Sequence, residues 1–211
     1  VLAKVFGERI YSIKKFNFDY FSLDGSSQLI AKTGYSRIGG FEIYLSRPEL
    51  GSSLWETILE AGRSENIRPG SPNIIDRVEA GLLSFGNEMT VENTPLECNM
   101  DKFLDINKEA DYIGKKVLQR QIRYGIKRRI RGVIYNGPKL PTISRPLQVF
   151  DINKRTIVGS LTSGAFSPHF KRNIGVGMIK YGYWDNNKKI LVNIADQEFR
   201  EGLIKDLPLI Q

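Results

Sequence analysis

The sequence has few of the residues that build metal centres and disulfides. Its 211 residues include one cysteine, Cys98, and one histidine, His169. A single cysteine excludes an internal disulfide and a cysteine metal cluster, and it favours a reducing compartment. His169 has no second His, no Cys and no carboxylate at ligand spacing, so we expect a positional or structural residue and no metal site.

Long apolar runs are also lacking. No segment approaches the roughly 20 apolar residues that a membrane-spanning helix requires. The first residues, VLAKVFGERIYSIKKF, lack an initiator Met and the apolar core of a signal peptide, and they begin as though within a helix. We therefore expect a fragment of a longer, cytoplasmic protein with no membrane partner.

Motifs for covalent catalysis are missing as well. The segment 159–164 has no Lys-Ser/Thr after its second glycine, so it is not a phosphate loop. No G-x-S-x-G motif surrounds a serine, and no base is identifiable beside Cys98. The catalytic residues therefore stay unassigned.

Positive charge is in excess, with 31 Lys and Arg against 23 Asp and Glu and a net charge of +8. These cations are dispersed except for one patch, 120–131 (RQIRYGIKRRIR), and no nucleic-acid module accompanies them. We expect no nucleic-acid partner. The patch is interpreted as a solvated face or linker, and an anion-facing role stays open.

The N-terminal part mixes helix and strand patterns. A helix end near Gly7 precedes the alternating aromatics of 16–20, which predict a strand, and Asp24-Gly25 predicts a turn. Ser53 and Glu56 form a capping box that predicts a helix from Ser53 to Gly62. Trp55 in this helix is expected in the core.

The C-terminal part changes to strand patterns. Asn73 is expected to cap a helix, and Asp111 to Arg120 predicts another. Beyond a boundary near Tyr124-Gly125, five short β-type runs predict a small all-β domain. These runs are Val133–Tyr135, Leu147–Phe150, Ile157–Leu161, Ile174–Ile179 and Ile190–Ile194.

One stretch, Leu29 to Leu45 (LIAKTGYSRIGGFEIYL), predicts a hairpin with a shaped loop. Two alternating apolar runs, Leu29–Lys32 and Phe41–Leu45, flank eight residues that include three glycines. Positive φ at these glycines, Gly34, Gly39 and Gly40, would let the loop fold over a bound molecule.

Two side chains of this hairpin suggest a ligand. In the second strand Glu42 and Tyr44 share one face, and Tyr35 and Glu42 would lie near the mouth of the loop. A carboxylate on a strand beside an aromatic ring suits a flat heterocycle with paired N–H donors, because it accepts both hydrogen bonds while the ring stacks. The alternative, a solvated Glu on an exposed sheet face, stays open.

The hairpin sequence TGYSRIGGFEIYL and four later blocks together carry a family resemblance. The later blocks are RVEAGLLSFGNEM (77–89), TPLE (94–97), DYIGKKVL (111–118) and VGSLTSGAFSPHFKRNIGVGMI (158–179). In this order they resemble the folate-binding aminomethyltransferase family, whose best known member is the T-protein of the glycine cleavage system. The segments ELGSSLWETI, SPHFKRNIGVGMIKYGYW and DLPLI are similar to one branch, the tetrahydrofolate-dependent dimethylsulfoniopropionate demethylases.

The resemblance implies an α+β fold in two parts. Residues 1–124 would be the C-terminal part of the folate-binding domain, an antiparallel sheet with helices that is incomplete at the N-terminus. Residues 125–211 would be the family's C-terminal β-barrel domain. The resemblance also implies tetrahydrofolate as cofactor, with Tyr35 and Glu42 at the pterin site.

The implied activity is methyl transfer from dimethylsulfoniopropionate, a small-molecule donor, to tetrahydrofolate, with methylmercaptopropionate as the second product. We expect the fragment alone to be inactive. Transfer from amines of the glycine cleavage type and a non-catalytic folate-binding protein stay open, as does a homodimer.

Three residues near the second helix bear on the donor and on the extent of the site. Asn73 occupies the position where the aminomethyltransferases have an Arg of the folate site, so a cation is missing there. Arg77 and Glu79, two residues apart on a helix, are expected in structural ion pairs outside the active site.

Overall fold

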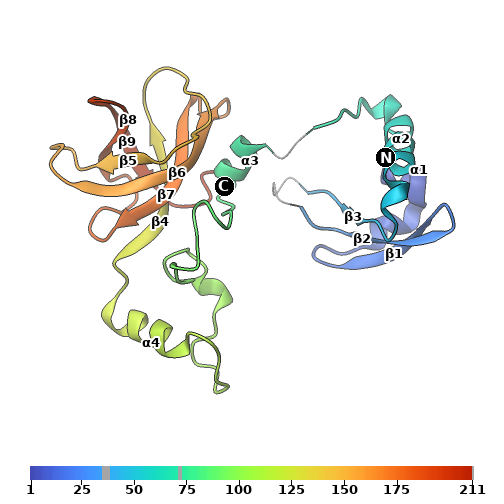
Figure 1. Ribbon diagram of the computed structural model, residues 1–211, viewed down its shortest axis with the longest axis horizontal. Coiled ribbons are helices and arrows are strands. Elements are labelled where there is room, and N and C mark those ends of the chain that lie inside the picture. The colour runs from blue at the N-terminus through green and yellow to red at the C-terminus, as the bar shows by residue number, and fades with distance from the viewer. Residues whose placement is uncertain (35–38, 71–72, 211) are drawn as a thin grey trace. The chain divides into compact units, whose positions relative to one another are not determined.

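A computed structural model describes residues 1–34, 39–70 and 73–210 (Figure 1). The chain divides into two compact units, 1–72 and 73–211, and each is described by itself. Within the described residues, no helix combines the length and the apolar character needed to cross a membrane.

The first unit is built on a three-stranded antiparallel sheet in the order β1-β2-β3. Strands β1 (Phe18–Leu23) and β2 (Ser26–Ala31) are joined by Asp24 and Gly25, which have φ of 46° and 73°. Two consecutive positive φ values are typical of the tight hairpin turn that the Asp-Gly pair predicts. Strand β3 (Glu42–Tyr44) completes the sheet.

The helices of this unit cover one face of the sheet. They are α1 (Leu2–Phe6), η1 (Glu8–Ser12), η2 (Pro48–Leu50), α2 (Gly51–Ala61) and η3 (Arg63–Glu65). Phe21, Leu23 and Ile30 are buried against Ile10 and Leu54 from these helices. In the described part of the unit, the two clusters of buried apolar side chains therefore lie on the helix-covered side of the sheet.

Two predictions for α2 were wrong. The helix begins at Gly51 without a side-chain cap, and the Ser53 hydroxyl donates to Asp24 Oδ2 at 2.8 Å instead of capping. Trp55 is 53% exposed, whereas Leu54 is buried. Consecutive helical residues point about 100° apart, so only one of the two can face the sheet. The predicted end at Gly62 is confirmed.

The second unit begins with α3 (Ile74–Glu79), which Asn73 caps as predicted: its side-chain oxygen accepts from Ile75 N at 2.9 Å. Irregular chain and η4 (Asp101–Phe103) lead to α4 (Lys115–Tyr124). The prediction placed this second helix four residues too early. Gly114 has φ of 85°, which a right-handed helix excludes, so the helix begins after it.

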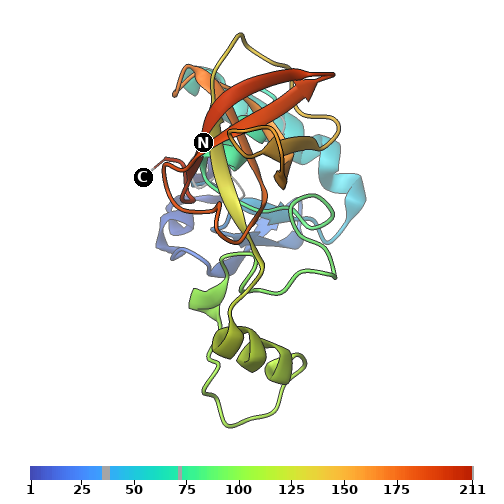
Figure 2. The same ribbon diagram turned by 90° about the vertical axis from the view of Figure 1, so that its left-hand side faces the viewer.

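Six antiparallel strands then form a closed barrel in the order β4-β7-β6-β5-β8-β9. The strands are β4 (Arg128–Tyr135), β5 (Leu147–Phe150), β6 (Ile157–Ser167), β7 (Arg172–Lys180), β8 (Lys189–Ala195) and β9 (Glu198–Lys205). Each of the five predicted runs falls within a strand, but β9 was missed. It pairs with both β8 and β4, so it closes the barrel; Figure 2 shows β8 and β9 in red as a long hairpin.

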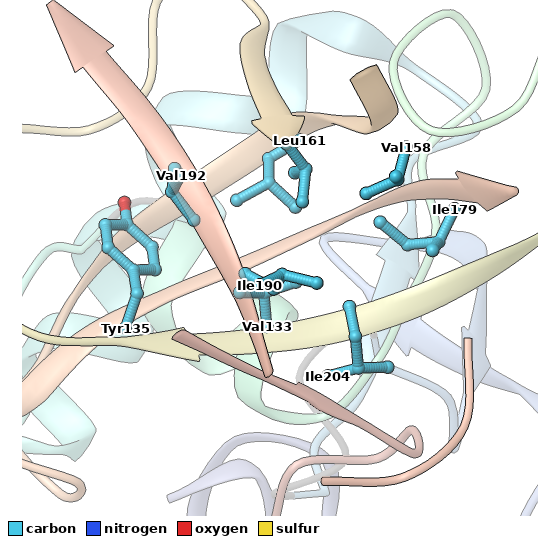
Figure 3. Packing of buried hydrophobic residues seen from close by; sticks show 9 residues of the cluster. Val133, Tyr135, Val158, Leu161, Ile179, Ile190, Val192 and Ile204 are labelled. Atoms are coloured by element: carbon cyan, nitrogen blue, oxygen red, sulfur yellow. The ribbon is translucent and has the colours of Figure 1, made fainter. Parts of the chain in front are cut away.

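Branched aliphatic side chains fill the barrel (Figure 3). Val133, Leu161, Ile190 and Ile204 come from four different strands and are at most 1% exposed. Alternate residues of each strand point inward, which is why a barrel of this size has a packed interior. The predicted α+β class with a C-terminal barrel is confirmed.

After β9 the chain returns to the start of its own unit (Figure 1). Leu209 N and Ile210 N donate to the Glu79 carbonyl at 2.8 and 3.1 Å. Leu209 packs with Val78 and Ile130 in a second buried cluster outside the barrel interior. The C-terminal segment therefore fastens α3 to the barrel. The domain boundary near Tyr124-Gly125 stays a prediction.

Candidate functional site

The predicted hairpin is present, with Leu29 opposite Tyr44, Ile30 opposite Ile43 and Ala31 opposite Glu42. Directly paired residues of antiparallel strands point to the same face. Glu42 and Tyr44 therefore lie on the face opposite the helices, as the alternation predicted, and both are exposed. Tyr35, the other predicted pterin residue, lies outside the described residues.

The loop between the strands carries glycines in conformations that other residues avoid. Gly39 and Gly40 have φ of 97° and 145°. This confirms the positive φ predicted for Gly39 and Gly40. The same prediction for Gly34 was wrong, because the backbone of Gly34 does not lie in the positive-φ region. Glu42 follows two residues later, at the first position of β3.

Glu42 retains hydrogen-bonding capacity. The Thr33 hydroxyl donates to Glu42 Oε2. A carboxylate has about four acceptor positions, so this donor, the one found among the described residues, leaves acceptor positions for a pair of N–H groups. The residue thus fits a heterocycle with paired donors, such as the pterin of a folate, and it remains a predicted binding residue.

Aromatic side chains surround Glu42 on the same face. In the strand register Tyr20, Leu29 and Tyr44 form one row, and Phe18, Ala31 and Glu42 form the next. Phe18, Tyr20 and Tyr44 are 58%, 55% and 56% exposed. The alternation of 16–20 signalled this aromatic face, but strand patterning alone does not say which face is buried.

Arg77 belongs to a buried structural network. Its guanidinium donates to both oxygens of Glu88, at 2.8 and 3.1 Å, and to Ser163 Oγ of β6 at 2.6 Å. The Glu88 side chain is fully buried and the Arg77 side chain is 11% exposed. The structural ion pair predicted for Arg77 is confirmed.

Glu79 is held differently. Its carboxylate accepts from the Ser167 hydroxyl at 2.5 Å, and both residues are buried. Among the described residues Glu79 has no cationic partner, and a barrel hydroxyl takes that place, so the expected ion pair is not found there. Together Arg77 and Glu79 fix α3 on strand β6.

Several cations of the basic patch are paired rather than free. Arg128 Nε lies 3.0 Å from Glu97 Oε1, and Arg129 Nη2 lies 3.4 Å from Asp101 Oδ1. Arg131 pairs with Asp206. These pairs join β4 to neighbouring segments of the second unit, which supports a structural role for this part of the patch.

The surroundings of the one cysteine, Cys98, and the one histidine, His169, point to structural roles. Cys98 is 4% exposed, and burial, with the neighbouring Glu97 carboxylate, raises the pKa of its thiol. A raised pKa lowers the thiolate fraction and hence reactivity. The His169 ring packs edge-on against Phe170, with ring centroids 4.9 Å apart.

A groove of about 420 Å³ lies on the barrel. Apolar residues including Ile134 and Phe170 line it, with Arg172, Lys189 and Lys205 among its charged residues. It contains neither Glu42 nor any other residue that the sequence singled out for a ligand. We therefore assign the candidate ligand site to the hairpin formed by β2 and β3.

Comparison with known proteins gives the class and then the family. The GCVT N-terminal domain matches residues 1–108, and the glycine cleavage T-protein C-terminal barrel domain matches residues 128–207. The chain thus joins the sheet of the first domain class to the barrel of the second. It belongs to the glycine cleavage T-protein family.

Curated relatives differ in the reactions that their names state. Dimethylsulfoniopropionate demethylase DmdA of Ruegeria pomeroyi is 40% identical over 184 residues, which is 87% of this chain and 49% of that protein. Aminomethyltransferases of Caldanaerobacter subterraneus and a Geobacillus species are 36% and 33% identical, over 97% of this chain and 54% and 56% of theirs. The chain therefore spans about half the length of these relatives.

A solved structure supports the fold. Aminomethyltransferase T of the glycine cleavage system of Bartonella henselae superposes with a TM-score of 0.77, at 21% identity, over 95% of this chain and 54% of that one. At this identity the likeness concerns the fold alone.

Proposed function

We propose that this chain is part of a cytoplasmic, tetrahydrofolate-dependent methyltransferase that demethylates dimethylsulfoniopropionate. The observation that carries the proposal is the 40% identity to the Ruegeria pomeroyi demethylase along 87% of the chain. The aminomethyltransferases are 32 to 36% identical, and they support the wider class of one-carbon transfer to a folate.

The proposed reaction requires the protein mainly to position the methyl donor and tetrahydrofolate. When bound, tetrahydrofolate supplies N5 as the acceptor: a C–N bond forms, the C–S bond breaks with its electron pair returning to sulfur, and N5 loses a proton. The sulfonium is already a good leaving group. Holding the two molecules in line and excluding water can therefore supply much of the rate.

Glu42 is proposed to orient the pterin. Its carboxylate lies on the exposed face of β3, and within the part of the chain that the structure describes the Thr33 hydroxyl is its side-chain donor. Charge-assisted hydrogen bonds to a paired donor edge fix both the position and the rotation of a ring. Tyr35 is proposed as a second pterin contact on the family resemblance alone.

Asn73 favours a cationic donor. Its side-chain oxygen is engaged as the cap of α3, at 2.9 Å from Ile75 N, so this residue has a structural use. The Arg that the family resemblance implies for the folate site at this position would add positive charge, which would oppose a cationic donor. Its replacement by a neutral residue is consistent with the sulfonium substrate.

The folate site is tested by Glu42→Ala in the whole gene product. We expect tetrahydrofolate affinity to fall about 10-fold to 150-fold, because charge-assisted hydrogen bonds contribute roughly 1.5 to 3 kcal/mol. Glu49→Ala, which removes another exposed carboxylate of the same unit, is the control. Calorimetric titration measures both, and unchanged affinity in Glu42→Ala would make Glu42 a plain surface carboxylate.

The donor is tested by competition. Dimethylsulfoniopropionate, dimethylglycine and an aminomethyl-lipoyl carrier are each supplied with tetrahydrofolate, and the folate product is followed. We expect the sulfonium to react fastest. Faster use of an amine would assign the protein to the amine-processing branch, and folate binding without turnover of any donor would identify a non-catalytic member.

A further inference from the structure

The groove of about 420 Å³ lies on the outer face of the barrel, over strands β4, β9 and β8. The register places Ile134, Leu203 and Lys189 opposite one another in one row, and directly paired residues point to the same side of a sheet. Val133 and Ile204, their neighbours in sequence, are buried in the barrel interior, so the row points outward. The volume of the groove is in the range of sites for small organic molecules, about 300 to 1,000 Å³.

The floor of the groove is apolar. Ile134 and Leu203 lie in the row itself, Phe170 comes from the connection between β6 and β7, and Ile152 comes from the connection between β5 and β6. Ile152 is 54% exposed, and the other three residues are half-buried. Outward positions of a sheet that faces water are usually polar, so apolar side chains gathered there indicate a binding surface.

The C-terminal segment of the chain covers the adjacent part of this outer face. Gly132 and Ile134, two residues apart on β4, point to the same side. A Cβ on Gly132 would lie 2.5 Å from Leu209 Cδ2 and 3.0 Å from Leu207 Cδ2, so these leucines pack directly on the strand. Neither leucine lines the groove beside Ile134. In the described part of the chain, the apolar floor is therefore open to a ligand.

The rim of the groove is mainly cationic. Its charged residues are three cations and one carboxylate: Arg172, Lys189, Lys205 and Glu201. Arg172 donates to the side-chain oxygen of Asn136, and Lys205 donates to that of Asn187, so both cations face neutral amides. No carboxylate of the described residues forms an ion pair with any of the three cations. An anion in the groove would therefore meet positive charge that the protein has not neutralised.

We propose that this groove binds a small amphipathic organic anion, an apolar body that carries one carboxylate. Lys189 lies opposite Leu203, and Lys205 lies two residues beyond Leu203 on the same side of β9, so the two lysines flank one end of the floor. The carboxylate would lie between the lysines, and the apolar body would extend over Leu203 and Ile134 toward Phe170. This second site lies outside the hairpin, and it needs neither folate binding nor methyl transfer.

The experiment compares probes that share an octyl-length chain and differ in the head group: octanoate, octylammonium and the neutral octanol. Calorimetry with the whole gene product gives their affinities. Lys189→Gln and Lys205→Gln each remove one positive charge, and Ile152→Ala removes apolar surface from an exposed connection. Lys116→Gln removes an exposed cation from α4, outside the groove, and is the matched control.

We expect octanoate to bind with a Kd of about 1 mM or tighter, and about 10-fold or more tightly than octanol or octylammonium. Each lysine variant should weaken octanoate binding about 2-fold to 5-fold and leave octanol binding unchanged, because a pair of partly exposed charges contributes modestly. Ile152→Ala should weaken the binding of octanoate and octanol equally, about 2-fold to 10-fold, because both lose the same apolar contact. Lys116→Gln should resemble the parent.

Several outcomes would overturn the proposal. Failure of octanoate to bind the whole gene product would show that protein fills the groove or that the groove takes no anion, and equal affinities for the three probes would show that the rim does not select charge. Octanoate binding that is unchanged in both lysine variants, or equally weakened in Lys116→Gln, would place the carboxylate elsewhere. Tetrahydrofolate affinity should stay within about twofold in every variant. Its loss in parallel would assign the lysines to the fold or to the folate site, which also overturns the proposal.

Discussion

The ion pair between Arg77 and Glu88 should be one of the most costly single features of the second unit to disrupt. Glu88→Ala removes the carboxylate that accepts two hydrogen bonds from Arg77 and one, at 2.7 Å, from Ser84 N. The guanidinium would keep the Leu82 carbonyl and Ser163 as partners but lose its counter-charge. A buried cation left in this state is strongly destabilising.

The magnitude follows from burial. With side-chain exposures of 11% and 0%, the pair is shielded from water, and breaking such a pair costs about 3 to 5 kcal/mol. Glu88→Gln keeps the shape and should cost less. The double variant Arg77→Met with Glu88→Leu removes both charges and should be clearly more stable than Glu88→Ala, because replacing a whole buried pair by apolar side chains is often nearly neutral.

Urea unfolding of the chain measures these differences. Trp184 packs against the barrel core, so its fluorescence reports on the second unit, and a Trp55→Phe background removes the signal of the first. The control is Glu198→Ala, which breaks an ion pair whose carboxylate is 57% exposed and should cost less than about 1 kcal/mol.

Two outcomes would refute this reasoning. A loss below 1 kcal/mol in Glu88→Ala would show that water or Ser163 solvates the guanidinium adequately. A double variant as unstable as Glu88→Ala would show that the contribution comes from packing shape and not from the uncompensated charge.

Two further predictions concern the barrel. Burial raises the pKa of Tyr135 from 10.0 to about 12, so the neutral phenol is favoured in the folded state. The contribution of Tyr135 to stability should therefore be constant below pH 10 and be lost between pH 10 and 12, and Tyr135→Phe should show a smaller fall over this range in pH-dependent urea titrations. Gly177→Ala would place a Cβ 1.9 Å from the Ser160 carbonyl oxygen and should cost at least about 1 to 3 kcal/mol in the unfolding assay that follows Trp184. A Gly177→Ala protein as stable as the parent, or a Tyr135→Phe protein with the parent's alkaline profile, would contradict the respective argument.

Much of the architecture could be predicted because local patterns and burial agree. The barrel strand Leu147–Phe150 was predicted with its observed bounds, since its apolar run is bordered by polar residues and proline. The hairpin followed from alternation around a glycine-rich loop, and its register confirmed which face Glu42 occupies. The identity of the predicted ligand, by contrast, was inferred from the family resemblance, because a carboxylate on a strand does not by itself identify what it binds.

The remaining features depend on contacts distant in sequence. Strand β9 carries Glu198, Arg200 and Glu201, so its composition resembles a loop, and only pairing with β4 and β8 makes it a strand. Trp55 was assigned to the core because local spacing does not reveal which flank of a helix faces a sheet. The Arg77–Glu88 pair joins residues 11 apart and could not be read from helical spacing.

The bonds from Leu209 and Ile210 to the Glu79 carbonyl give the second unit an unusual connectivity. The C-terminal end of α3 and residues 209–210 are hydrogen-bonded to each other, so the polypeptide between them forms a closed loop. A pulling force on the C-terminal segment would act on these hydrogen bonds, and on the bond between Ser167 and Glu79, before it acted on the hydrogen bonds between the barrel strands. The C-terminal end of α3 and residues 209–210 should therefore separate before the barrel strands do.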